Sequence, residues 1–117
     1  MATGDVERET PNVWWVNQGK TFRHESAAGY FWAPLRDRRG AYPPHWRRME
    51  EVRAGDIVLH YSDGFVRAIS LVQGPPQRAL YPHDRHGDYG GREGNLIYSE
   101  YHYLEPPVPR EVAARLQ

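Results

Sequence analysis

The chain has 117 residues, with 15 basic and 15 acidic side chains and no cysteine. A formal net charge of zero gives no argument from bulk charge for a nucleic-acid, membrane or acidic partner. The absence of cysteine excludes disulfides, zinc–thiolate sites and thiol nucleophiles. Aromatic residues make up 13% of this small chain, so the rings belong either to a core built on Trp and Tyr or to an aromatic surface pocket.

The N-terminal segment is polar and acidic, and it lacks the apolar stretch of a signal peptide. We expect residues 1–11 to form a disordered lead-in and residues 12–117 to form one domain, since the length suits a single core. No apolar run approaches the roughly 18 residues that a membrane-spanning helix needs. We therefore expect a cytoplasmic protein without a membrane partner.

Two short aromatic segments follow. Val13–Asn17 is apolar up to its last residue, which predicts a strand buried on both faces. Residues 18–29 are polar and are predicted to form either a loop or a short helical turn around residues 25–28. Tyr30–Trp32 is predicted to be a second strand that Pro34 ends, because proline cannot donate a hydrogen bond to a central ladder.

The middle of the chain carries the clearest structural pattern. Residues 35–44 are predicted to be a loop, and His45–Glu51 to form about two helical turns with Trp46 and Met49 on one side. Residues 57–72 are predicted to be a β-hairpin. Its first strand is aliphatic, Ser-Asp-Gly at 62–64 is typical of a tight turn, and the return strand runs over 65–72.

The C-terminal part is predicted to begin with a long polar loop at 77–94, a length that is typical of functional or disordered connections. A final strand is predicted at 95–104, ended by the prolines at 106–109, and a short helical tail at 110–117. The sum is an α+β fold. We expect a small twisted β-barrel of about five to six mostly antiparallel strands with short flanking helices.

Four segments, in this order and at this spacing, resemble the EVE domain: Trp14–Thr21, Gly29–Pro34, Val52–Tyr61 and Ala68–Val72. The resemblance covers roughly residues 13–109. EVE domains belong to the PUA-like superfamily, which includes the YTH domains, and the family implies a barrel-like sheet flanked by helices. It also implies a function, because EVE and YTH domains bind modified bases in an aromatic cage. EVE-like domains occur in bacterial modification-dependent restriction systems, fused to nuclease or GTPase modules.

The resemblance assigns base-binding roles to particular residues. Trp32, followed by Ala33 and Pro34, matches the position of a cage Trp at the end of the second strand. Residues just past the first strand contact the base edge and sugar in the family. The second cage aromatic comes from the segment after the hairpin, where the family's usual Trp is missing here, which leaves Tyr81 and Tyr89 as candidates.

The polar candidates have both a functional and an ordinary interpretation. The amides of Asn17 and Gln18 donate and accept hydrogen bonds, which suits a cytosine or adenine edge, but they are equally typical of a solvated loop. Asp63 either forms the hairpin turn or accepts from the exocyclic amine of cytosine. Strand alternation lets at most one of Trp14 and Trp15 reach a pocket. The base-binding candidates are Trp14, Asn17, Gln18, Gly19, Trp32, Ala33, Pro34, Ser62, Asp63, Tyr81 and Tyr89.

Positive charge is concentrated between residues 36 and 48, where five arginines stand against one aspartate, an excess of four. Such segregation suits contacts with phosphates even in a neutral chain, although it also occurs in ordinary solvated loops. Lys20 and Arg23 add two further cations beside the proposed base site. The phosphate-binding candidates are Lys20, Arg23, Arg36, Arg38, Arg39, Arg47 and Arg48.

The sequence shows no Ser-His-Asp context, P-loop or dinucleotide-binding glycine pattern, so we expect no enzymatic activity, no cofactor and no bound metal. The first hypothesis is a reader that flips a modified base of double-stranded DNA into an aromatic cage. 5-Methylcytosine is favoured over N6-methyladenine because of the restriction-linked members of the family. Its partner would be a separate or fused nuclease. The alternative is a PUA-like RNA-binding or protein-interaction module whose Trp residues are purely structural.

Overall fold

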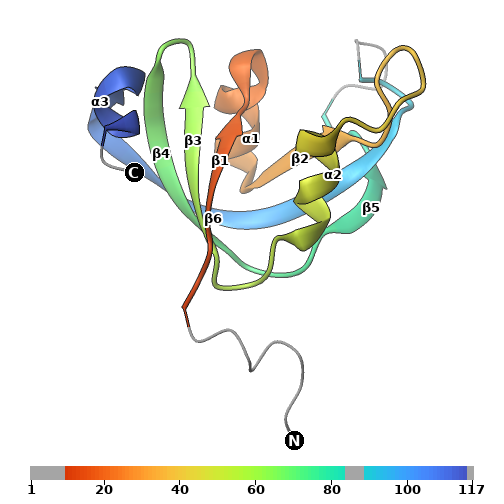
Figure 1. Ribbon diagram of the computed structural model, residues 1–117, viewed down its shortest axis with the longest axis horizontal. Coiled ribbons are helices and arrows are strands. Elements are labelled where there is room, and N and C mark those ends of the chain that lie inside the picture. The colour runs from red at the N-terminus through yellow and green to blue at the C-terminus, as the bar shows by residue number, and fades with distance from the viewer. Residues whose placement is uncertain (1–9, 84–88, 116–117) are drawn as a thin grey trace, which may run out of the picture.

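A computed structural model describes residues 10–83 and 89–115. It shows an α+β structure in which one curled, mixed sheet forms a half-barrel accompanied by short helices (Figure 1). The predicted α+β class is confirmed in this form. Among the described residues, no helix is long and apolar enough to cross a membrane.

The main path of the sheet has the strand order β1-β3-β4-β6-β2, so β1 and β2 stand at its two ends, and β5 pairs with β6 off this path. β1 runs parallel to β3, and the other pairs are antiparallel. The strands are β1 (Val13–Asn17), β2 (Tyr30–Pro34), β3 (Ile57–Ser62), β4 (Phe65–Val72), β5 (Gln77–Leu80) and β6 (Glu93–Pro109).

The first strand lies where the sequence predicts it, but the prediction that both of its faces are buried is wrong. Trp14, Trp15 and Val16 are only partly buried, and Val13 at the start of the strand is 58% exposed. An apolar run of five residues has the same composition in a central strand and at a sheet edge, so the pattern could not separate the two. β2 ends at Pro34 as predicted.

The hairpin of β3 and β4 is confirmed. Asp63 and Gly64 both have positive φ angles, of 50° and 87°, which is the backbone that a tight two-residue hairpin turn requires. Asp63 is thus a turn-forming residue. Along β4 the odd-numbered residues face outward and the even-numbered ones are buried.

The segment predicted as a long loop at 77–94 contains β5, and β6 already begins at Glu93. The sequence pattern does not indicate this strand, because β5 is only four residues long, partly polar and mostly exposed. Residues 84–88 of the predicted loop lie outside the described residues, as do 1–9 of the predicted lead-in and 116–117 of the predicted tail.

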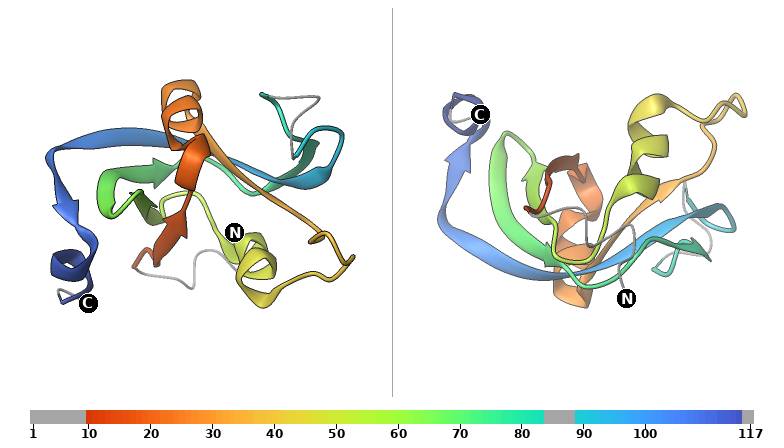
Figure 2. Two further views of the ribbon diagram at one scale, coloured as in Figure 1. Left: turned by 90° about the horizontal axis from the view of Figure 1, so that it is seen from above. Right: turned by 60° about the horizontal axis from the view of Figure 1, so that its bottom comes forward.

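The last strand is longer than predicted, since β6 continues through the prolines to Pro109. Between the pairs Ala68–Tyr103 and Val66–Val108, β4 advances by two residues and β6 by five. Pro106 and Pro107 fall within these extra residues, where no ladder hydrogen bond is needed from them. Figure 2 shows β6 sweeping across the molecule from β5 to the C-terminal helix.

Short helices connect the strands. The region predicted as a loop with one turn forms η2 (Gly19–Thr21) and α1 (Phe22–Ala28), and Gly29 ends α1 in the left-handed conformation at φ 84°. The predicted two turns after residue 44 are α2 (Pro44–Arg47) and η3 (Arg48–Glu51). α3 (Arg110–Ala114) forms the predicted C-terminal helix.

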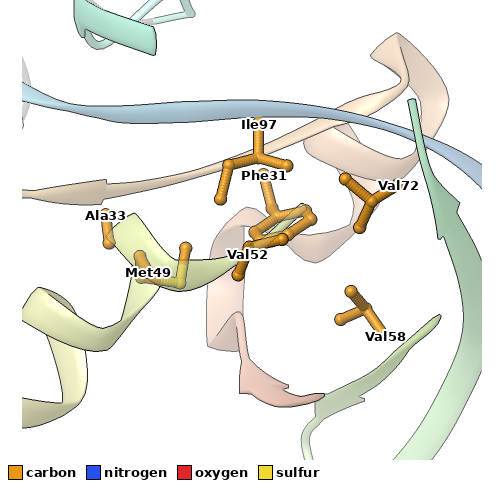
Figure 3. Packing of buried hydrophobic residues seen from close by; sticks show 7 residues of the cluster. All are labelled: Phe31, Ala33, Met49, Val52, Val58, Val72 and Ile97. Carbon is orange, nitrogen blue, oxygen red and sulfur yellow. The ribbon is translucent and has the colours of Figure 1, made fainter. Parts of the chain in front are cut away.

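The hydrophobic core lies inside the curl of the sheet, and η3 covers it (Figure 3). Phe31 is at its centre and is fully buried, with Trp46 and Trp14 packed against the cluster from outside. The predicted placement of Trp46 and Met49 toward a core is confirmed. The buried members of the cluster are Phe31, Ala33, Met49, Val52, Val58, Val72 and Ile97.

A second cluster occupies the opposite face of β2, where the Trp32 ring lies over the backbone of β6. Gly94 of β6 pairs with Pro34, which comes two residues after Trp32 on β2. A Cβ atom at Gly94 would overlap both the Trp32 ring and the carbonyl oxygen of Ala33. Glycine is therefore required here by space, because the indole and the strand backbone approach too closely for any side chain.

We predict that Gly94→Ala lowers the free energy of unfolding by about 1–3 kcal/mol, the usual range for overpacking a filled site. The control is Gly74→Ala, since a Cβ there meets no atom within 4 Å. Urea denaturation of both variants checks this. Equal stability of the two would contradict the account of Gly94.

Candidate functional site

A cavity of about 320 Å³ lies between the two end strands of the half-barrel. β1 and β2 both contribute to its wall, as do α1, α2 and the segment that follows β5. We call this space the seam cavity. It is lined by Trp15, Val16, Asn17, Gln18, Thr21, Glu25, Trp32, Ala33, Pro34, His45, Trp46, Met49, Tyr81 and Tyr89.

Aromatic rings enclose the seam cavity from several elements. Trp32 of β2 contacts Tyr81 and Tyr89, with ring centroids 4.9 and 5.5 Å apart, and the two Tyr rings are 5.6 Å from each other. Trp15 comes from β1 and Trp46 from α2. The cavity is therefore bordered by rings that belong to segments far apart in the sequence.

Trp32 serves both as a wall of the cavity and as a packed residue. Its side chain is 8% exposed, and its indole Nε1 donates to the carbonyl oxygen of Ala79 in β5 at 3.0 Å. This hydrogen bond fixes the plane of the ring. The structure thus shows that Trp32 is packed and lines a cavity, and its role as the wall of a base cage stays a prediction.

The floor of the seam cavity is polar and is formed by Gln18, Thr21 and Glu25. The Gln18 amide donates from Nε2 to Glu25 Oε1 at 2.6 Å and to the Tyr101 hydroxyl at 3.1 Å. Its Oε1 accepts from His60 Nδ1 at 2.6 Å. Both amide hydrogens and the amide oxygen are thus engaged within the protein, so Gln18 positions its neighbours and does not offer these hydrogens to a ligand.

The hydrogen-bond directions follow from this arrangement. Because Gln18 Oε1 can only accept, His60 carries its proton on Nδ1, and its Nε2 accepts from Ser70 Oγ at 2.6 Å. Ser99 Oγ then donates to Ser70 Oγ at 2.5 Å. Burial lowers the pKa of His60 to about 3, so the ring is neutral at physiological pH.

Glu25 is the buried acidic group of the floor, with 1% of its surface exposed. Burial raises the pKa of its carboxyl group to about 7, against the opposing effect of the hydrogen bond from Gln18. No cation among the described residues forms an ion pair with Glu25. A carboxyl group that is buried, unpaired by charge and close to half-ionised at neutral pH is typical of a functional site.

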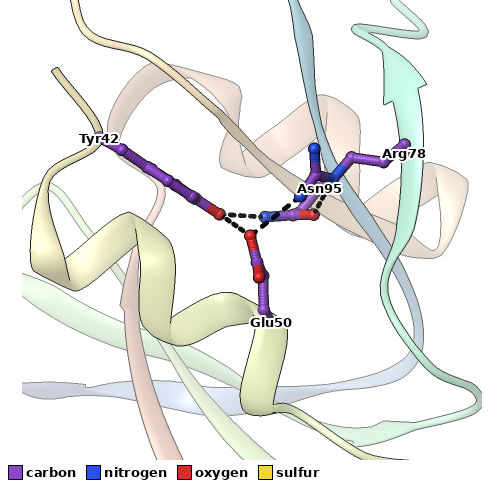
Figure 4. A network of polar contacts seen from close by, with 4 residues as sticks. All are labelled: Tyr42, Glu50, Arg78 and Asn95. Carbon is purple, nitrogen blue, oxygen red and sulfur yellow. Dashed lines mark hydrogen bonds and ion pairs between the residues drawn. The ribbon is translucent and has the colours of Figure 1, made fainter.

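The α2 wall is tied to the sheet by a polar network shown in Figure 4. Arg78 of β5 donates to Glu50 Oε2 at 3.0 Å and to Asn95 Oδ1 at 3.2 Å. Asn95 donates to the Tyr42 hydroxyl at 3.0 Å, and that hydroxyl donates to Glu50. These contacts hold the segment that carries Trp46 against β5 and β6.

Trp14, one of the predicted base-binding residues, lies outside the seam cavity, and Trp15 lines it instead. Trp14 packs against the core, and its Nε1 donates to Asp56 Oδ2 at 2.8 Å. Asp56 also accepts from the backbone of Asn12 and Arg53. The Gly-Asp turn before β3 thus holds the start of β1 in place.

Three other base-binding candidates, Gly19, Ser62 and Asp63, lie in a second, more open hollow of about 520 Å³ with Lys20, Arg23 and Arg67. Ser62 Oγ donates to the Gly19 carbonyl at 2.8 Å. The hollow adjoins the floor of the seam cavity because Gly19 directly follows Gln18. Asn17, Gln18, Trp32, Ala33, Pro34, Tyr81 and Tyr89 are the predicted base-binding residues that the seam cavity brings together.

The arginine-rich segment continues from β2 into α2. Arg36 and Arg47 both lie over the ring of Tyr42, at 5.9 and 5.6 Å, and Arg48 lies over Trp14 at 6.0 Å. These three side chains therefore also contribute to packing. Arg38 and Arg39 are exposed on the loop between β2 and α2.

Sequence reasoning missed Thr21, Glu25, His45 and Trp46 as cavity residues. Trp46 carried a signal, since its spacing with Met49 predicted a buried face, but the pattern did not show that this face borders an opening. Glu25 carried none, because one glutamate in a polar segment has no distinguishing neighbours. Comparisons with protein-family models and with curated proteins give no match for this chain.

The raised pKa of Glu25 predicts a pH-dependent stability. The folded state holds the Glu25 proton up to about pH 7 and the unfolded state only up to 4.5, so this group stabilises the fold below pH 4.5 and loses that contribution as the pH rises to 7. The lowered pKa of His60 acts in the opposite direction between about 3 and 6.5. The two effects oppose each other between pH 4.5 and 6.5.

We predict that the stability of the wild type relative to Glu25→Gln falls as the pH rises from 4.5 to 7, by at most about 1.4 kcal/mol per pH unit, and is constant above pH 8. Urea denaturation at each pH measures it. Glu111→Gln, an exposed control on α3, should show no such trend. A difference between wild type and Glu25→Gln that does not vary with pH would contradict the burial of an ionisable Glu25.

Proposed function

We propose that this chain is an EVE-like member of the PUA-like superfamily that reads a modified base of double-stranded DNA. The base would leave the duplex and enter the seam cavity. The observation that carries the proposal is that this cavity combines aromatic walls from separate elements with a polar floor. An extruded base needs both, rings on which its faces stack and groups that satisfy its hydrogen-bonding edge.

The size of the seam cavity supports a small, flat ligand. Its volume of about 320 Å³ lies at the lower end of the roughly 300–1,000 Å³ typical of small-molecule sites. Aromatic stacking contributes about 1–3 kcal/mol per base, and an added methyl group that fills an apolar gap contributes about 0.8 kcal/mol. A preference for the modified base would therefore come from close fit between the rings.

Positive charge on both sides of the seam cavity supports a nucleic-acid partner. The hollow with Lys20, Arg23 and Arg67 adjoins the floor. The arginine-rich loop leads from β2, which carries Trp32, to α2, which carries Trp46. Phosphates on either side of an extruded nucleotide would lie over these two surfaces, since backbone contacts position the duplex without reading its sequence.

The finer parts of the proposal rest on the EVE resemblance. They are the small twisted barrel of the PUA-like type, 5-methylcytosine as the favoured base over N6-methyladenine, and a nuclease as the separate or fused partner in a cytoplasmic restriction system. The curled half-barrel is compatible with that fold. No residue of the seam cavity identifies which modification the base carries.

The alternative function is a PUA-like module that binds RNA or protein without regard to base modification. One observation favours it. The outer face of the sheet bears an apolar groove bordered by Val13, Leu59, Ile69 and Val108, with Ile69 36% exposed. Exposed apolar surface of this kind is typical of protein-interaction sites.

We predict tighter binding of a duplex that carries one 5-methylcytosine than of the same duplex without the methyl group. Tyr89→Ala and Trp15→Ala should each weaken binding of the methylated duplex by roughly 5- to 100-fold through lost stacking. Neither ring is fully buried, so the fold should persist. Fluorescence anisotropy with labelled duplexes measures all four affinities, and N6-methyladenine duplexes and RNA are tested in parallel.

A matched control separates base recognition from backbone binding. Arg38→Ala combined with Arg39→Ala should weaken the methylated and unmethylated duplexes by the same factor and reduce the salt dependence of binding by about two phosphate contacts. The proposed function fails if the wild-type protein binds every modified duplex no more tightly than its unmodified counterpart. Preferential binding of RNA would favour the alternative.

A further inference from the structure

The floor of the seam cavity holds one acidic side chain that forms no ion pair with a cation of the described residues. Glu25 is 1% exposed and lines the cavity from α1. Burying a carboxylate without a charged partner is unfavourable. A fold that maintains such a group beneath an aromatic cavity provides a strong hydrogen-bond acceptor for whatever enters.

The surroundings of Glu25 leave part of its accepting capacity open. Gln18 Nε2 donates to Oε1 at 2.6 Å, while the Thr21 hydroxyl donates to the carbonyl oxygen of Gln18 at 2.8 Å. A carboxylate has about four lone-pair positions on its two oxygens, so the hydrogen bond from Gln18 does not saturate it. Because the amide hydrogens of Gln18 are engaged with Glu25 and Tyr101, Glu25 is the acceptor that the floor can offer.

The position of the carboxylate is fixed from the core. Gln18 is held by His60, and His60 by Ser70 and then Ser99. This buried chain runs through β3, β4 and β6, so the acceptor at the floor is held rigidly by the sheet. A rigid acceptor favours ligands that present a hydrogen-bond donor to it. A ligand with a carbonyl oxygen at that point would place two acceptors opposite each other, with no proton between them.

We infer that Glu25 is the specificity-determining residue of the seam cavity, and that the bound base must direct an N–H donor, such as the exocyclic amine of cytosine or adenine, at its carboxylate. This inference rests on the proposed function, because it assigns a role within the same cavity. It goes further by excluding bases whose corresponding edge is a carbonyl oxygen. Gln18 acts as the residue that positions Glu25.

The test compares two bases that share a methyl group and differ at the edge. 5-Methylcytosine carries an amine at the position where thymine carries a carbonyl oxygen. Each is placed at the same site of one duplex, opposite an abasic position, so that neither must break a base pair to leave the helix. At pH 8, where Glu25 is mostly ionised, the wild-type protein should bind 5-methylcytosine roughly tenfold or more tightly than thymine.

Glu25→Gln keeps the shape of the side chain, and its amide oxygen can still accept from Gln18, which leaves an N–H group toward the cavity. This variant should lose the preference for 5-methylcytosine and bind thymine at least as well. Glu111→Gln, on the exposed helix α3, is the matched control and should bind like the wild type. An unchanged ranking of the two bases in Glu25→Gln would overturn the inference.

A second measurement uses the wild-type protein alone, so it does not depend on the folding of a variant. The groups facing Glu25 are the hydroxyls of Tyr30 on β2 and Tyr101 on β6, both with pKa values raised by burial first and by the Glu25 charge, and His60 on β3 beyond Gln18. None of these titrates between pH 6 and 8 in the folded protein. His45 of α2 also lines the cavity, so the measurement compares 5-methylcytosine with thymine in the same duplex, and the effect of His45 on DNA binding in general cancels. With the Glu25 pKa near 7, the affinity for 5-methylcytosine relative to thymine should fall roughly tenfold or more from pH 8 to pH 6.

The outcomes separate this inference from the proposed function. Equal binding of methylated and unmethylated cytosine by the wild type would remove the proposed function and the inference together. A preference for methylated cytosine without any discrimination against thymine would leave the proposed function standing and overturn the role of Glu25. A preference for 5-methylcytosine over thymine that is constant or larger at pH 6 would overturn it as well.

Discussion

The sheet of this protein does not close, and most other features of the molecule follow from that constraint. β1 and β2 stand at the two ends of the strand order and are not paired with each other among the described residues. A curled sheet with two unpaired edges leaves a seam that side chains and helices must cover. Here α1 and α2 border the seam, and aromatic rings from β1, β2 and the segment after β5 line the remaining space. The candidate site is therefore the gap in the barrel, built from the elements that cover its edges.

The Gln18 side chain connects this gap to the core. It follows β1 directly and joins α1, β3 and β6 through Glu25, His60 and Tyr101. Buried polar groups stabilise a fold only when every member has its partner, so the network couples the position of the floor to the packing of the sheet. A change in Gln18 would alter folding and the cavity together. Glu25 stands at the end of the network, so its substitution changes the lining of the cavity and leaves the bonds from Gln18 to His60 and Tyr101 in place.

Sequence reasoning located every strand except β5, the hairpin and most of the aromatic residues of the cavity, because periodicity and turn residues are local signals. It did not predict that β1 is a parallel edge strand, and for that reason could not choose between Trp14 and Trp15. The parallel pairing of β1 with β3 is a contact over more than 40 residues that no local pattern encodes. The same limit explains Glu25, whose role depends on burial and on Gln18, which is itself held by His60 of β3 and Tyr101 of β6. The extension of β6 past Pro106 depends on an irregular register with β4, which is also a non-local property.

We propose that the seam cavity receives a base extruded from DNA. Fluorescence of 2-aminopurine placed beside the modified base in a duplex reports this step most directly, because the fluorophore brightens when its neighbour leaves the stack. The account predicts a saturable increase when the protein binds the duplex carrying 5-methylcytosine, and a much smaller one for the Trp15→Ala variant at saturating protein. Tight binding of the modified duplex with no change in 2-aminopurine fluorescence would contradict it.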